Sequence, residues 1–152
     1  MASSSGTEKR RRAGSTMREL FKSPHIRLCH DTSHDVVVIT RSALNYDSVV
    51  ELNDTFARME LAMQAVVKPR TVLFIDSRLA PLRNDPVFEA AFDENRQRFT
   101  KGFKKVSVLV KTAVGKLQIQ RHSKMDGLPM GVFTDPLDAL AYLELPPWIE
   151  VD

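Results

Sequence analysis

The sequence predicts an α/β protein built on a single sheet, with an antiparallel N-terminal hairpin followed by βαβαβα crossovers. Between Val72 and Leu143 lie three apolar runs, VLFID, KVSVLV and MGVFT, and each precedes a segment with helical character. Parallel strands need a connection of a dozen or more residues, usually a helix, so this alternation indicates a parallel sheet. Two shorter apolar runs before it indicate the hairpin.

Residues 25–31 and 35–41 read as the two hairpin strands, joined by residues 32–34. Within the second strand, VVVI at 36–39 has the continuous apolar character of a strand that is buried on both faces. The next helix begins at Ser48, which with Glu51 forms the sequence pattern of a capping box. An apolar stripe follows at spacings of three and four: Val49, Leu52, Phe56, Met59, Met63 and Val66.

Residues 71–75 form the expected central strand. Asp85-Pro86 then opens a second helix, because aspartate is a good N-cap and proline suits the first helical position. Residues 105–110 read as a strand and residues 113–125 as a third helix.

A last strand at 132–134 precedes a short helix that Asp135-Pro136 opens in the same way. The sequence thus predicts one domain over 25–145, with residues 146–152 as a C-terminal tail. Right-handed crossovers should place the helices on the sheet in two groups.

Positive charge is concentrated at the N-terminus. Residues 1–24 hold six basic and two acidic groups, whereas the remainder holds 16 basic and 17 acidic ones. Residues 1–17 are rich in Ser and Gly without apolar periodicity, so we interpret 1–24 as a disordered basic tail and lead-in. Because the rest is nearly neutral, we do not expect nucleic acid as a partner except through this tail.

The composition favours a cytoplasmic protein. Hydrophobic residues make up 43% and charged residues 27% of the 152 positions, which is ordinary for a soluble domain. No apolar run approaches the roughly 18 residues of a membrane span, and no secretory signal pattern opens the chain. The single cysteine, Cys29, excludes an internal disulfide and fits a reducing compartment.

No residue pattern indicates an enzyme, a metal or a cofactor. The four histidines lack the spacing of zinc ligands. A convergent acid, base and nucleophile are not recognisable either. We therefore expect a non-catalytic protein.

Asp76 and Ser77 form the first candidate site, because ligands gather at the carboxyl ends of strands in open α/β sheets. Asp76 could serve as a ligand or base, and Ser77 is a candidate phosphoacceptor. The structural alternative is that Asp76 accepts hydrogen bonds from free amides of the following loop.

The second candidate site is anion-binding and comprises Lys111, Thr112, Gly115 and Lys116, where a strand leads into a helix. Backbone amides and the helix dipole favour anions at such a helix start. The residues do not match a phosphate-binding P-loop. The alternative is a capped helix start with solvated lysines.

Three stretches, VLFIDSRLAPLRNDPVFEAAF, FKKVSVLVKTAVGKLQIQRHSKMDG and VFTDPLDALAYL, together with the element order, resemble the STAS superfamily. Within it the chain looks most like the bacterial SpoIIAA-like group, also labelled STAS/SEC14-like. The resemblance implies a protein-interaction module in bacterial signalling. Its partner would be a kinase-like or sigma-regulatory protein, docked on residues around the second helix's start: Ser77, Arg78, Arg83, Asn84 and Asp85.

In partner-switching members of that superfamily, a serine that follows an aspartate is phosphorylated. Asp76-Ser77 matches these letters, although Arg78 begins a different continuation. By element order, the position of the phosphorylated serine falls instead near residues 84–86, which include no hydroxyl. Asp85 would supply a permanent negative charge there.

The alternative function is a domain that binds a small anion, a nucleotide or a lipid. We expect a single sheet of this size to leave little room for a lipid cavity of roughly 300–1,000 Å³.

Overall fold

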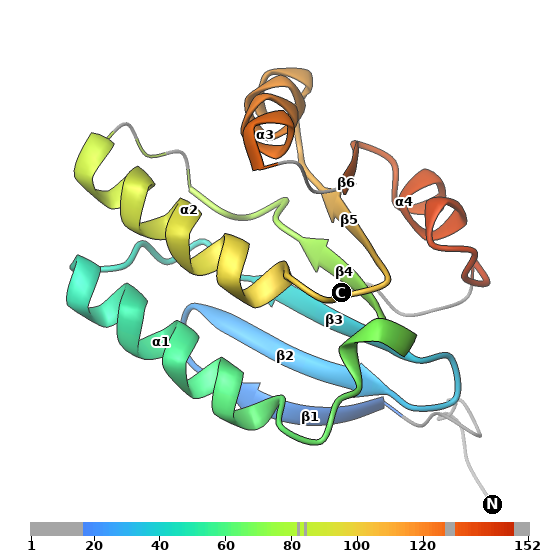
Figure 1. Cartoon of the computed structure of the whole chain (residues 1–152). Helices are drawn as coiled ribbons and strands as arrows, with labels where there is room; N and C mark the ends of the chain where they lie inside the picture. Colours follow the sequence, from blue (N-terminus) through green and yellow to red (C-terminus); the bar gives the residue numbers. More distant parts are fainter. Residues whose placement is uncertain (1–16, 82, 84, 127–129, 148–152) are drawn as a thin grey trace, which may run out of the picture.

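Six strands form one mixed sheet in the order β1-β2-β3-β4-β5-β6 (Figure 1). The computed structural model describes residues 17–81, 83, 85–126 and 130–147. The first three strands pair antiparallel and the last four pair parallel; the antiparallel pairing of β2 with β3 and the parallel part of the sheet are as the sequence predicts. The strands are β1 (Met17–Lys22), β2 (Ile26–Asp31), β3 (Val36–Arg41), β4 (Val72–Asp76), β5 (Lys105–Leu109) and β6 (Met130–Phe133).

Three helices connect successive parallel strands, and a fourth follows β6. They are α1 (Val49–Ala62), α2 (Pro86–Thr100), α3 (Ala113–Asp126) and α4 (Pro136–Tyr142), with a 3₁₀ turn at Lys68–Arg70. Side chains of α1, α2 and α3 pack on one face of the sheet and those of α4 on the other, so the helices form the two expected groups (Figure 1). None of the helices in the described ranges is long and apolar enough to span a membrane.

The core consists of two apolar layers because successive side chains of a strand point to opposite faces. In β3, Val37 and Ile39 face the layer under α1 and α2, whereas Val36 and Val38 face the layer under α4. All four are at most 5% exposed, which confirms that this strand is buried on both faces.

The helix starts are held by the predicted caps. Ser48 Oγ accepts a hydrogen bond from the Glu51 amide at 3.1 Å, and Glu51 Oε1 accepts one from the Asp47 amide at 2.7 Å. Asp85 and Asp135 accept amide hydrogen bonds from the first turns of α2 and α4. Each cap satisfies amides that have no partner within the helix.

The sheet begins earlier than the sequence predicts. Strand β1 pairs with β2, so the fold includes Met17–Lys22, which we assigned to the tail and lead-in before residue 25. A bulge between Glu19 and Phe21 explains why the strand pattern is hidden. The extra residue lets both Leu20 and Phe21 pack against the core, which breaks the alternation that marks a strand. Residues 1–16 and 148–152 of the predicted tails lie outside the described residues.

Candidate functional site

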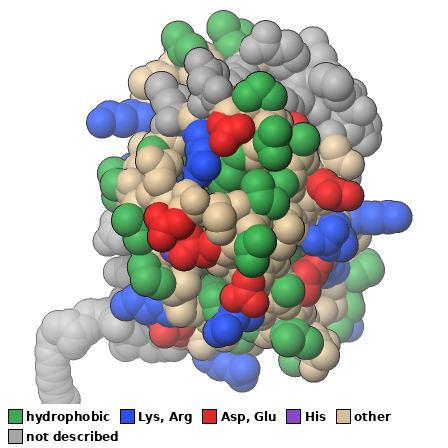
Figure 2. All heavy atoms as spheres, turned by 90° about the vertical axis from the view of Figure 1, so that its left-hand side faces the viewer, with side chains coloured by type: hydrophobic (Ala, Val, Ile, Leu, Met, Phe, Trp, Pro, Cys, Tyr) green, Lys and Arg blue, Asp and Glu red, His purple; other side chains and the backbone are tan. Residues whose placement is uncertain are grey.

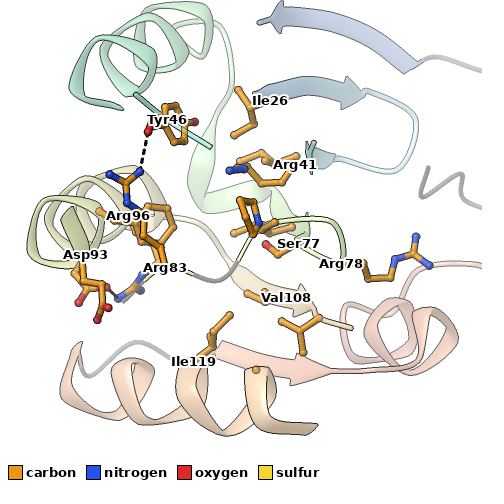
Figure 3. A pocket seen from close by; sticks show the side chains of 18 of the residues that line it. Ile26, Arg41, Tyr46, Ser77, Arg78, Arg83, Asp93, Arg96, Val108 and Ile119 are labelled. Atoms are coloured by element: carbon orange, nitrogen blue, oxygen red, sulfur yellow. Dashed lines mark hydrogen bonds and ion pairs between the residues drawn. The ribbon is translucent and has the colours of Figure 1, made fainter. Parts of the chain in front are cut away.

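A pocket of about 380 Å³ lies between the sheet and helices α1, α2 and α3, at the carboxyl ends of β3, β4 and β5 (Figure 3). Open parallel sheets bind ligands at this edge. The apolar lining comes from both the sheet and the helices, and includes Ile39, Ile75, Val108, Val110, Phe56, Phe88, Phe92 and Ile119.

The pocket exists because the helices cover only part of the central strand. Leu73 and Ile75 point to the same face of β4, since side chains two residues apart share a face. Leu73 is fully buried beneath the helices, whereas Ile75 is only partly buried and lines the pocket. The amino half of β4 is therefore packed, and its carboxyl end forms part of the pocket floor.

Basic side chains border this apolar floor, and Arg78, Arg83 and Arg96 among them are paired with acids. Arg83 Nη2 lies 3.6 Å from Asp85 Oδ2, and Arg96 Nη2 lies 3.5 Å from Asp93 Oδ1. The Arg83 guanidinium also lies over the Phe88 ring, 3.7 Å from its centroid. These arginines thus have anionic partners within the protein.

Arg41 has only neutral partners among the described residues. Its Nη1 donates to the Ser42 carbonyl at 3.4 Å and its Nη2 to the Leu44 carbonyl at 3.2 Å. Its guanidinium carbon lies 5.1 Å from the centre of the Tyr46 ring. Burial lowers the pKa of Arg41, partly opposed by Tyr46.

Tyr46 joins the loop after β3 to the segment before α2. Its ring stacks on His25 with centroids 4.2 Å apart, and its backbone carbonyl accepts a hydrogen bond from Arg83 Nη1 at 2.7 Å. Burial raises the pKa of the Tyr46 phenol, so the hydroxyl is protonated near neutral pH. The residue therefore supplies a rigid aromatic wall at the pocket.

Asp76 has the structural role that we considered as the alternative. Its carboxylate accepts two hydrogen bonds from the Arg78 guanidinium, at 3.0 and 2.7 Å, and one from the Arg78 amide at 3.1 Å. Figure 3 shows the Arg78 guanidinium directed away from the other labelled side chains. Ser77 lines the pocket and its amide donates to the Leu109 carbonyl. The predicted partner-binding residue Asn84 lies outside the described residues.

The start of α3 also has a structural cap. Thr112 Oγ1 accepts a hydrogen bond from the Gly115 amide at 3.1 Å, so the hydroxyl occupies a position that a bound anion would need. Lys111, Thr112 and Gly115 line the pocket, whereas Lys116 is not among the lining residues.

The structure thus brings both predicted sites to one pocket: Ser77, Arg78 and Arg83 from the first, Lys111, Thr112 and Gly115 from the second. Sequence reasoning missed Arg41, Tyr46 and Arg96. Arg41 could have been found, because it is the last residue of β3, and the rule that selected Asp76 at the end of β4 applies equally to it.

A Ser-His-Asp cluster occurs in the β2–β3 turn, but its geometry is unlike that of a catalytic triad. Ser33 Oγ and Asp31 Oδ2 both contact His34 Nδ1, at 3.0 and 3.1 Å. In a triad, serine and aspartate bind opposite ring nitrogens. Ser33 also donates to Asp31 Oδ1 at 2.8 Å, so these residues clamp the turn. No group of three or more potential metal ligands occurs in the described part of the chain.

Acidic and basic side chains are interspersed on the molecular face shown in Figure 2. Such a face provides no extended positive area for a phosphate backbone. Comparison of the chain with protein-family models, curated proteins and solved structures finds no match. The resemblance to the STAS superfamily therefore stays a prediction.

Proposed function

We propose that this chain is a binding domain for a small, mainly apolar ligand. The observation that carries the proposal is the pocket of about 380 Å³ at the carboxyl edge of the parallel strands. Ligand sites typically have volumes of roughly 300–1,000 Å³. The expectation that a sheet of this size has little room for such a cavity is wrong, because the helices leave the carboxyl end of β4 uncovered.

The chemistry of the walls favours an apolar ligand body. Ile75 and Phe92 are incompletely buried, so both present apolar surface to solvent within the pocket. Covering such surface is favourable by about 25 cal/mol per Å². Water in contact with these side chains finds few hydrogen-bond partners, and its displacement by an apolar group increases affinity.

The polar groups at the pocket favour binding over turnover. Asp76, the carboxylate that the sequence suggested as a base, is not among the residues that line the pocket, and it is engaged by the Arg78 side chain and amide. Thr112 holds the start of α3 through its hydroxyl. These groups support the fold around the pocket, which is the arrangement of a receptor with preformed walls.

A neutral fluorescent probe, N-phenyl-1-naphthylamine, tests the proposal. We expect saturable binding of one probe per chain, seen as increased fluorescence. Ile75→Trp should abolish this binding because the indole would fill the pocket from its floor. Leu137→Trp is the matched control: it adds the same ring to an exposed position on α4 and should leave binding unchanged.

The proposal fails if the wild-type chain binds no probe, or if Ile75→Trp binds it as the wild type does. Thermal unfolding of each variant shows whether the substituted chain is folded, so a lost signal can be assigned to the filled pocket.

A protein-interaction role is the second candidate. The docking residues that the resemblance implies, Ser77, Arg83 and Asp85, lie at or next to the pocket. Two exposed apolar side chains accompany them, Leu79 at 61% and Val87 at 72% exposure. This observation favours a surface that a protein partner could share, and a ligand in the pocket would then lie beside that partner.

A further inference from the structure

We propose that the ligand carries one negative charge and that Arg41 binds it. This inference rests on the proposed function, because it assigns the charge and orientation of the ligand in the same pocket. The apolar body of the ligand would lie over the strand residues of the floor, with its anionic group at the end of β3.

The first argument is the difference between Arg41 and the other arginines of the pocket. Arg83 and Arg96 each form an ion pair within α2 or at its start, and Arg78 forms one with Asp76. In the described ranges Arg41 forms none, and its hydrogen bonds go to two backbone carbonyls at 3.2 and 3.4 Å. Both distances exceed the commonest N–H···O value of about 2.9–3.0 Å and both acceptors are neutral, so a carboxylate would be a stronger acceptor for the guanidinium.

The second argument is the cost of burying the cation. Arg41 is partly buried, and that burial lowers its pKa, which means that the charged form is incompletely compensated. A buried charge is stabilised by an opposite charge with good hydrogen-bond geometry. A carboxylate matches the planar guanidinium with two parallel hydrogen bonds.

The third argument is the shape of the floor next to Arg41. Ile39, Ile75 and Val108 lie in register on neighbouring strands and all line the pocket. Because adjacent strands are about 4.8 Å apart, this row is roughly 10 Å long. Arg41 lies two residues beyond Ile39 on the same face of β3, so the cation stands at one end of an apolar row.

The opposite wall limits the charge of the ligand. Glu89 and Asp93 of α2 also line the pocket. Asp93 is paired with Arg96, so Glu89 is the carboxylate on this wall that disfavours a ligand with several negative charges, such as a nucleotide. The combination fits an aromatic or short-chain monocarboxylate with an apolar body.

The experiment compares two competitors of N-phenyl-1-naphthylamine that share one apolar body, 4-phenylbutanoate and 4-phenylbutan-1-ol. The full-length wild type should bind the acid about 10- to 100-fold more tightly than the alcohol, the range for a charge-assisted hydrogen bond. Arg41→Met should abolish this preference and leave the affinity for the alcohol unchanged. Arg41→Lys should retain part of the preference, and Lys116→Met, outside the pocket lining, should retain all of it.

Equal affinities of the wild type for the acid and the alcohol would overturn the inference and leave the proposed function intact. A full preference in Arg41→Met would also overturn it, because another cation would then bind the anion. If Arg41→Met loses the alcohol as well, the variant is misfolded and Arg41→Lys decides: a retained preference supports the inference, and a lost one overturns it. Failure of the probe itself to bind the wild type contradicts the proposed function.

Discussion

Asp85 determines where α2 begins through one carboxylate oxygen. Its Oδ1 accepts hydrogen bonds from the amides of Val87 and Phe88, at 3.2 and 3.3 Å. Asp85→Ala should therefore lower the free energy of unfolding by about 1 kcal/mol, the usual cost of losing an N-cap. Asp85→Asn should cost much less, because the amide oxygen can accept the same bonds. Urea unfolding of the two variants measures the difference.

Equal losses in the two variants would mean that the fold is stabilised by the ion pair with Arg83, which both substitutions remove, and not by the cap.

The cap also affects the design of docking experiments. Because Asp85 holds the helix, a charge reversal there would disturb α2 and the pocket together. Val87, which is exposed, can be changed without removing the cap.

Strand β1 is the element whose contribution the sequence analysis underestimates. It pairs with β2, and its Leu20 and Phe21 pack against the core. A chain that begins at Met17 keeps this strand, and we expect its melting temperature to lie within about 2 °C of the full-length value. A chain that begins at Ser23 should lose about 2–4 kcal/mol, because two half-buried apolar side chains and a strand ladder are removed.

Calorimetric melting of the two shortened chains tests this prediction. Loss of β1 would also expose the edge of β2, so the shorter chain should aggregate more readily. If the chain that begins at Met17 melted ten degrees lower, residues 1–16 would pack on the fold. If the chain that begins at Ser23 melted as the full-length protein does, β1 would not stabilise the sheet.

The elements with local signals could be predicted, and those shaped by distant contacts could not. Ser48, Asp85 and Asp135 mark helix starts because capping involves residues only two or three positions apart. Gly102 marks the end of α2 for the same reason, and its φ of 98° suits glycine. Strand β1 lacks such a signal, since its bulge depends on its pairing with β2.

The pocket, too, could be predicted from the sequence only in part. Its position at the carboxyl ends of the strands follows from the parallel sheet, which is why both predicted sites contribute residues to it. Its volume does not follow from the sequence, because Ile75 and Phe56 have the patterns of core residues. Only the relative placement of α1, α2 and α3 determines which of these side chains packs and which lines a cavity.

Cys29 allows the cooperativity of the whole molecule to be measured. Its thiol is the only one in the sequence, lies in β2, and is 4% exposed. Burial is the largest effect and raises its pKa; Arg27 lowers the pKa and Glu19 raises it, both by less. If the sheet opens only on global unfolding, a disulfide reagent at about pH 8 should modify the folded chain at least about 10³-fold more slowly than the chain in urea. A cysteine placed at the exposed Val50 in a Cys29→Ala chain is the control and should react rapidly.

The raised pKa of Cys29 also predicts how the free energy of unfolding changes with pH. Because burial raises the pKa of Cys29 in the folded chain, the unfolded chain loses the thiol proton at a lower pH. Ionisation therefore favours the unfolded state once the pH exceeds about 8.5, the ordinary pKa of a cysteine thiol. The free energy of unfolding continues to fall until the thiol of the folded chain also ionises. Below that pH both states hold the proton and the thiol contributes no pH dependence. The fall in unfolding free energy between about pH 8 and pH 10 should thus be smaller in Cys29→Ala than in the wild type. Identical slopes, together with rapid labelling of Cys29 in the folded chain, would show that β2 opens locally and that the sheet does not unfold as one unit.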